Sequence, residues 1–77
     1  MPIRVRYFAS LREHMGRAEE TVEPGRVATV EEVWKTVAGD VALPANTLIA
    51  VNMEYADSDQ QVADGDEVAF FPPVTGG

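Results

Sequence analysis

The residues with the clearest chemical potential are the last six, Pro72-Pro73-Val74-Thr75-Gly76-Gly77. Paired prolines favour an extended backbone, so this segment can reach roughly 20 Å from a folded body. Glycine has no β-carbon, so Gly76 and Gly77 suit a channel too narrow for other residues. We expect Gly77 to present a free carboxylate, which becomes an acyl donor once activated, for example as an acyl adenylate. The alternative interpretation is an ordinary frayed terminus.

Side chains offer little alternative chemistry. The chain has no cysteine and one histidine, His14, so neither thiol catalysis nor a Ser–His–Asp arrangement is indicated. Asp57 and Asp59 flank a serine but lack the rest of a calcium-binding loop. Asp64 and Asp66 surround a glycine and are typical of a turn. We therefore expect no metal site and no bound cofactor, which leaves the backbone terminus as the reactive group.

The net charge of −7 is unevenly distributed. Residues 1–35 contain all six basic residues and nearly half of the 13 acidic residues. The charged residues in 36–77 are all acidic. Such a surface is repelled by nucleic acid and by anionic membranes, and it suits a partner with a basic docking surface, although it also serves solubility. No apolar run approaches the ~20 residues that span a bilayer, and no secretion signal is visible. A soluble, cytoplasmic protein is expected.

The elements that must carry the tail begin with a strand over residues 3–7, where apolar and polar positions alternate. Ser10 and Glu13 have the spacing of a capping box, which predicts a short helical turn starting there. Leu11 would then face the core, and Gly16 would end the turn. A second strand is predicted over residues 19–23, antiparallel to the first.

The main helix is predicted over residues 29–38. Thr29 and Glu32 form a second capping-box pattern, and Gly39 is a natural terminator. Apolar residues recur at the spacing of one helix face, which makes Trp34 a core residue rather than a ligand site.

Three further strands complete the prediction. Residues 48–51 are an apolar run typical of a buried strand, and Asn52 suits a turn with positive φ. A short strand is expected near Tyr55. The last strand covers residues 67–71, with Val68 and Phe70 on one face and Ala69 and Phe71 on the other. One helix with a sheet of four to five strands predicts an α+β domain over residues 1–71 with a flexible tail over 72–77. If the last strand lies parallel to the first, the fold is the ubiquitin-like β-grasp.

Several segments together resemble the molybdopterin synthase small subunit, the MoaD-like family of ubiquitin-like sulfur carriers. The most specific is Phe-Phe-Pro-Pro-Val-Thr-Gly-Gly at residues 70–77, preceded by Asp-Gly-Asp-Glu-Val-Ala at 64–69. Ala-Val-Asn at residues 50–52 and the opening segments 5–9 and 11–13 also match. The similarity spans nearly the whole chain and is weak over residues 40–47 and 54–62.

The resemblance implies a carrier that works through its C-terminus. An adenylating enzyme related to ubiquitin activators would use ATP to convert Gly77 into an acyl adenylate, and a sulfur donor system would produce a thiocarboxylate. The tail would insert into the large synthase subunit and donate sulfur to a pyranopterin precursor, forming the molybdopterin dithiolene. The family assembly is a heterotetramer of two large and two small subunits.

Partner binding is expected to involve Phe8 and Phe71, which would lie on adjacent strands and face outward. The tail residues Pro72, Pro73, Val74 and Thr75 would continue that contact, and Gly76 would accompany Gly77 into the partner's site. Two alternatives remain open. The chain could carry sulfur for thiamine synthesis or tRNA thiolation, or it could be a β-grasp binding module or a protein modifier.

Overall fold

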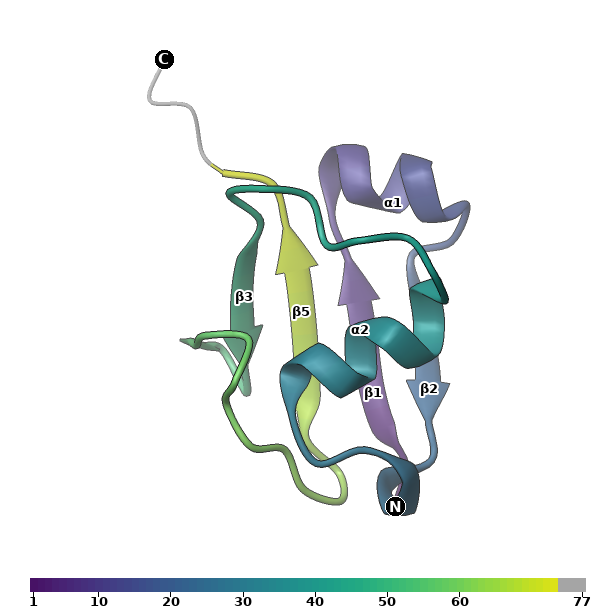
Figure 1. Ribbon diagram of the computed structural model, residues 1–77, viewed down its shortest axis with the longest axis vertical. Helices are drawn as coiled ribbons and strands as arrows, with labels where there is room; N and C mark the ends of the chain where they lie inside the picture. The colour runs from purple at the N-terminus through teal and green to yellow at the C-terminus, as the bar shows by residue number, and fades with distance from the viewer. Residues whose placement is uncertain (74–77) are drawn as a thin grey trace.

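Five strands form one mixed sheet, and helix α2 covers one of its faces (Figure 1). The computed structural model describes residues 1–73. A 3₁₀ turn over Pro24–Arg26 leads from the second strand toward α2. In chain order the elements are β1 (Ile3–Tyr7), α1 (Ala9–Met15), β2 (Glu19–Val22), α2 (Val30–Ala38), β3 (Leu48–Val51), β4 (Glu54–Tyr55) and β5 (Glu67–Phe71).

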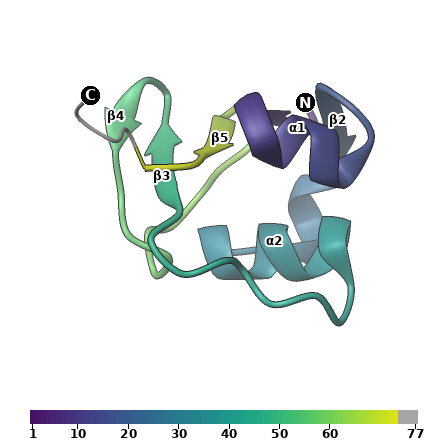
Figure 2. The same cartoon turned by 90° about the horizontal axis from the view of Figure 1, so that it is seen from above.

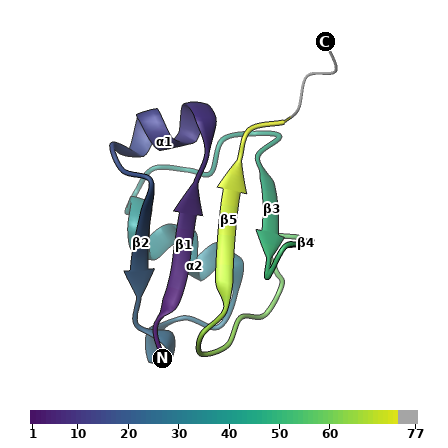
Figure 3. The same ribbon diagram turned by 180° about the vertical axis from the view of Figure 1, so that it is seen from behind.

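The strand order is β2-β1-β5-β3-β4, and β1 and β5 lie parallel at the centre (Figure 3). The other pairs, β1 with β2, β3 with β5 and β3 with β4, are antiparallel. In the central pair Val5 lies opposite Val68, and Tyr7 lies opposite Phe70. The parallel first and last strands confirm the β-grasp topology that the sequence predicted conditionally.

The core lies between the inner face of the sheet and α2. Phe70 is fully buried and stacks on Tyr7 with ring centroids 6.3 Å apart. Trp34 meets Phe70 edge-on at 5.1 Å, and its indole nitrogen donates a hydrogen bond of 2.9 Å to the carbonyl of Val41. Trp34 is only 3% exposed. Its burial leaves no polar side-chain atom without a partner, because the indole N–H is hydrogen-bonded. The predicted core role of Trp34 is confirmed.

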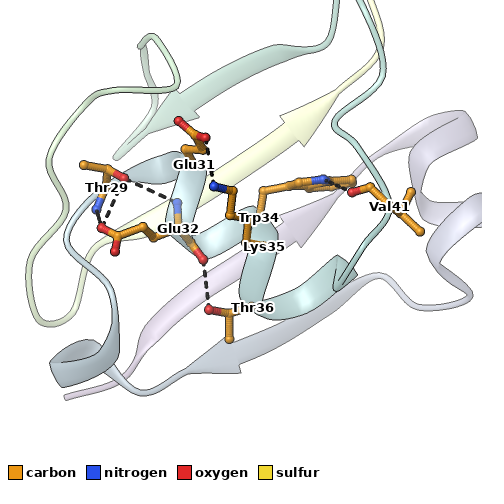
Figure 4. A network of polar contacts seen from close by, with 7 residues as sticks. All are labelled: Thr29, Glu31, Glu32, Trp34, Lys35, Thr36 and Val41. Atoms are coloured by element: carbon orange, nitrogen blue, oxygen red, sulfur yellow. Dashed lines mark hydrogen bonds and ion pairs between the residues drawn. The ribbon is translucent and has the colours of Figure 1, made fainter.

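The N-terminus of α2 is held by the predicted capping box (Figure 4). The hydroxyl of Thr29 accepts from the backbone N–H of Glu32 at 3.3 Å, and the Glu32 carboxylate accepts from the N–H of Thr29 at 3.1 Å. Two N–H groups that have no partner inside the helix are thereby satisfied. Gly39, with φ of 64°, follows the last helical turn as predicted.

Thr29→Ala is expected to lower the free energy of unfolding by about 1 kcal/mol, because the substitution removes the cap acceptor. Thr36→Ala is the matched control. The hydroxyl of Thr36 donates to the Glu32 carbonyl inside the same helix, a bond that contributes little to helix stability. Urea denaturation of both variants checks this, and equal losses would contradict the role assigned to the cap.

Two local predictions were wrong, the capping box at Ser10 and the full burial of the strand over residues 48–51. Helix α1 begins at Ala9 without a side-chain cap, so Ser10 is already inside the helix and forms no capping box. The backbone N–H of Phe8 extends the ladder to the Phe70 carbonyl, and the Phe8 carbonyl accepts from Leu11 at 3.1 Å, so the helix starts directly from the strand. The rest of the α1 prediction is confirmed, since Leu11 is buried and Gly16 ends the helix.

The strand over residues 48–51 was predicted to be buried, and this is correct only for Ile49. Leu48, Ala50 and Val51 are half-buried. α2 covers one face of the sheet, so Leu48 and Ala50 emerge on the other face. Val51 lies on the same face as Ile49 and is a partly buried residue packed against the core.

Candidate docking face and tail exit

The face of the sheet turned away from α2, here called the outer face, is lined by small and aromatic side chains. Figure 3 looks onto this face, with α2 behind the strands. Its centre is a shallow hollow of about 210 Å³. The hollow is lined by Arg6, Phe8, Ala50, Met53, Glu67, Ala69 and Phe71.

Aromatic rings converge on this hollow. Phe8 and Phe71 meet edge-on with centroids 6.4 Å apart, and Tyr55 lies 6.0 Å from Phe71 on the other side. Phe8 is 40% exposed and Tyr55 is 76% exposed, so both rings are accessible. The structure therefore brings Phe8 and Phe71 together facing outward as predicted, although Phe8 directly follows β1 as the N-cap residue of α1 and only Phe71 lies in a strand.

Ion pairs border the outer face on its β1 side. Arg6 lies 3.5 Å from Glu67 and 4.0 Å from Glu19, and its guanidinium is 5.1 Å from the centroid of the Phe8 ring. Arg4 lies 3.9 Å from the same Glu67. Exposed pairs of this kind contribute about 0–1 kcal/mol each. Their main effect is to hold the arginine side chains across the sheet.

The tail leaves the domain at the end of β5, next to the outer face. Phe71 is the last residue of β5 and lies opposite Leu48 of β3. The strand ends there because the next residue, Pro72, has no N–H to donate to the ladder. Pro72 and Pro73 line a small cavity of about 220 Å³ between α1 and the loop before β3, at the same end of the sheet as α1 (Figure 1). A protein bound to the outer face would thus meet Pro72 and Pro73 at its edge. The predicted site residues Val74, Thr75, Gly76 and Gly77 lie outside the described residues.

Sequence reasoning missed Tyr55 and Met53 as members of the outer face. Both are determined by the hairpin between β3 and β4, in which Tyr55 lies opposite Ala50. The available signal was Asn52, because a two-residue turn after residue 51 sets which side of the sheet residue 55 faces. The predicted positive φ of Asn52 is confirmed at 51°.

The strongest polar network in the described residues lies away from this face. The Tyr7 hydroxyl donates to Glu20, whose carboxylate also binds Arg17 at 2.6 Å. Burial, followed by the bond to Glu20, raises the pKa of Tyr7 well above its usual range, and the bond to Glu20 raises the pKa of Arg17. Arg17 also donates to the Val37 carbonyl at the end of α2, at 3.2 Å. The network joins β1, β2 and α2 and keeps Tyr7 protonated, which is a structural function.

Within residues 1–73 no three His, Asp or Glu side chains are grouped so that they could hold a metal ion. The helices of this part of the chain are all too short or too polar to cross a membrane. His14 is exposed and lines the cavity that also contains Pro72 and Pro73.

Comparison with known proteins identifies relatives over the full length. The model of the ThiS family matches residues 5–77. The molybdopterin synthase sulfur carrier subunit of Escherichia coli is 41% identical over 97% of this chain and 99% of its own length. The protein of the same name from Chlamydomonas reinhardtii is 40% identical over 100% of both chains. Among solved structures, SAMP1 of Haloferax volcanii, small archaeal modifier protein 1, superposes with a TM-score of 0.80 at 28% identity and covers 100% of both chains.

Proposed function

The chain belongs to the ThiS family, and from that premise we propose that it is the sulfur carrier subunit of a molybdopterin synthase. The observation that carries this proposal is the 41% identity to the Escherichia coli protein of that name over nearly the full length of both chains. The family match runs through Gly77, so the segment that the chemistry needs is included. The ubiquitin-like β-grasp fold, with β5 leading into the tail, agrees with this role.

In this proposal the chain itself binds no cofactor, and its reactive group is the carboxylate of Gly77. An adenylating enzyme transfers AMP from ATP to that carboxylate, because a free carboxylate is too poor an electrophile to react. Pyrophosphate leaves in that step, and sulfide-level sulfur from a donor then attacks the acyl carbon, so that a C–S bond forms, AMP leaves and a thiocarboxylate remains. The tail delivers this sulfur to a pyranopterin precursor inside the large synthase subunit. Gly76 and Gly77 allow the backbone to reach a buried centre through a narrow channel.

The outer face is the surface on which the large subunit docks, in a heterotetramer of two large and two small chains. Phe8, Phe71 and Tyr55 offer aromatic rings around a shallow hollow, the composition enriched at the centre of protein interfaces. Because β5 connects this face directly to Pro72 and Pro73, docking and insertion of the tail become one event. The same partner then sets both the position and the direction of the tail.

Phe71→Ala is expected to weaken binding of the large subunit about 30-fold or more, since truncation of a central aromatic anchor costs ~2 kcal/mol. Val41→Ala is the matched control. Val41 is 48% exposed and lies beside α2 on the opposite side of the molecule. Isothermal titration calorimetry against the large subunit checks both variants. Equal affinity of wild type and Phe71→Ala would remove the outer face from the proposed interface.

The function itself is tested by mass spectrometry of the C-terminal peptide after incubation with ATP, the adenylating enzyme and a sulfur donor. Replacement of one terminal oxygen by sulfur is expected. The sulfurated carrier, mixed with the large subunit and the pyranopterin precursor, is expected to yield molybdopterin. A sulfurated carrier that supports thiazole formation instead would assign it to another pathway.

A protein modifier is the second candidate, favoured by the full-length similarity to SAMP1. A modifier would form isopeptide bonds between Gly77 and lysine side chains of other proteins. Digestion of cell extract and a search for peptides branched at lysine distinguish this role, since a pure sulfur carrier produces none.

A further inference from the structure

Met53 occupies a backbone conformation that favours glycine. The β3–β4 hairpin turns through Asn52 and Met53, whose φ angles are 51° and 71°. Two successive residues with positive φ form the turn that best matches the twist of a hairpin, and its preferred sequence is Asn-Gly. Asparagine tolerates this region because its side chain bonds locally, whereas methionine has no such compensation. Met53 is therefore a strained choice at the tip of the hairpin.

Nothing in the described part of the chain repays this strain. The Met53 side chain is 91% exposed, so the free protein gains almost no apolar burial from it. A glycine would relieve the backbone, and a polar residue would avoid exposing a thioether to water. Strain of this kind at an exposed residue indicates a role in binding rather than in folding.

The hairpin tip is also held in place. The side-chain amide of Asn52 donates to Asp66 at 3.0 Å and its oxygen accepts from the N–H of Glu67 at 3.0 Å, while the Asn52 N–H donates to the Glu67 carbonyl at 2.8 Å. These three bonds tie the turn to the start of β5. The turn between β3 and β4 lies away from α2 in Figure 2, and Met53, one of its two residues, lines the hollow of the outer face.

This position adjoins the outer face. Met53 lines the same hollow as Phe8 and Phe71, and Tyr55, two residues further on, lies against Phe71. The hairpin therefore extends the apolar surface beyond the central strands, across the β3–β4 edge of the sheet. Because the turn backbone is already held by the bonds of Asn52, insertion of Met53 orders its side chain alone and costs little backbone freedom, which lengthens the lifetime of a complex.

We propose that Met53 is a partner-recognition residue that inserts into an apolar recess of the large synthase subunit. The inference rests on the proposed function and adds a specificity residue to its docking face. Charge indicates what surrounds the recess: Glu54 and Asp66 lie beside the hairpin, whereas Arg4 and Arg6 lie on the β1 side. By charge complementarity, the recess is bordered by basic side chains on the side that faces Glu54 and Asp66. On the side that faces β1, where Arg4 and Arg6 lie, it is bordered by acidic side chains. A second copy of this chain is disfavoured as the occupant, because each copy carries −7.

The test is Met53→Gly, which separates binding from folding. The variant is expected to melt at the same temperature as wild type or higher, since glycine suits the turn. Its affinity for the large subunit is expected to fall about tenfold. Met53→Leu, which keeps an apolar side chain of similar volume, is expected to retain most of the affinity. Val41→Ala, an exposed apolar residue on the opposite side, is expected to bind like wild type.

Unchanged affinity of Met53→Gly, or a melting temperature well below wild type, overturns the proposal. So does a wild-type dimer in gel filtration that Met53→Gly dissolves, because the tip would then serve self-association. Failure of the proposed function has a different signature: wild-type carrier would itself fail to bind the large subunit. When wild type binds and Met53→Gly binds equally well, only the role of Met53 is lost.

Discussion

Deletion of Gly77 is expected to reduce molybdopterin synthesis by at least about 100-fold while leaving the free energy of unfolding unchanged. Removing one residue withdraws the reactive carbon by about 3.5 Å, and misplacement of a reacting group by about 1 Å can already cost 10²-fold. Every strand pairing of the described residues lies at or before Phe71, the last residue of β5, so the deletion leaves those pairings in place.

The measurement is the rate of molybdopterin formation with the reconstituted synthase, together with the mass of the C-terminal peptide after activation. Deletion of Met1 is the control for loss of a terminal residue. The Met1 amino group makes an exposed 3.9 Å contact to Asp64, and the Met1 carbonyl accepts from the N–H of Gly65 at 3.1 Å, both at the opposite end of the sheet from the tail exit. A Gly77-deleted carrier that still supports synthesis at the wild-type rate would show that the chemistry lies elsewhere.

Phe70→Ala is expected to lower the free energy of unfolding by about 3–5 kcal/mol, the usual loss for a buried aromatic residue. Phe70 is fully buried and contacts both Tyr7 and Trp34. A chain of 77 residues has a total stability of roughly 4–12 kcal/mol, so the variant is expected to be partly unfolded at 37 °C (about body temperature).

The neighbouring residue supplies the matched control. Phe71 points to the opposite face of the sheet, where its ring contacts Phe8 and Tyr55 but stays half-exposed. Phe71→Ala is therefore expected to lose about 1 kcal/mol or less, although it weakens docking. Chemical denaturation of both variants measures the difference. Similar losses at the two positions would contradict the division of β5 into a core face and a docking face.

The comparison of Phe70 with Phe71 also shows how far sequence reasoning reached. The alternation along residues 67–71 correctly assigned one phenylalanine to each face, because side chains of a strand alternate by geometry. This assignment does not depend on how α2 packs against the sheet. The capping box at Thr29 was predictable for a similar reason, since its bonds form within four residues. Ser10 has the same pattern, yet it forms no cap. The N–H of Phe8 extends the ladder between β1 and β5, and the helix begins at the next residue, so Ser10 already lies inside it.

The sequence by itself determined most of the local elements, the sides of β1 and β5 that enter the core, and the tail with its glycine pair. These depend on contacts between residues a few positions apart, whose geometry is the same in any fold. Phe8 and Phe71 were predicted to face outward together, whereas the tertiary structure alone decided that Tyr55 and Met53 join them on one surface. Phe8, Tyr55 and Phe71 come together because β1, β5 and β3 pair across long stretches of chain, and the hairpin places Met53 beside them. Pairing at that distance along the chain follows from the packing of the whole domain, which no local pattern records.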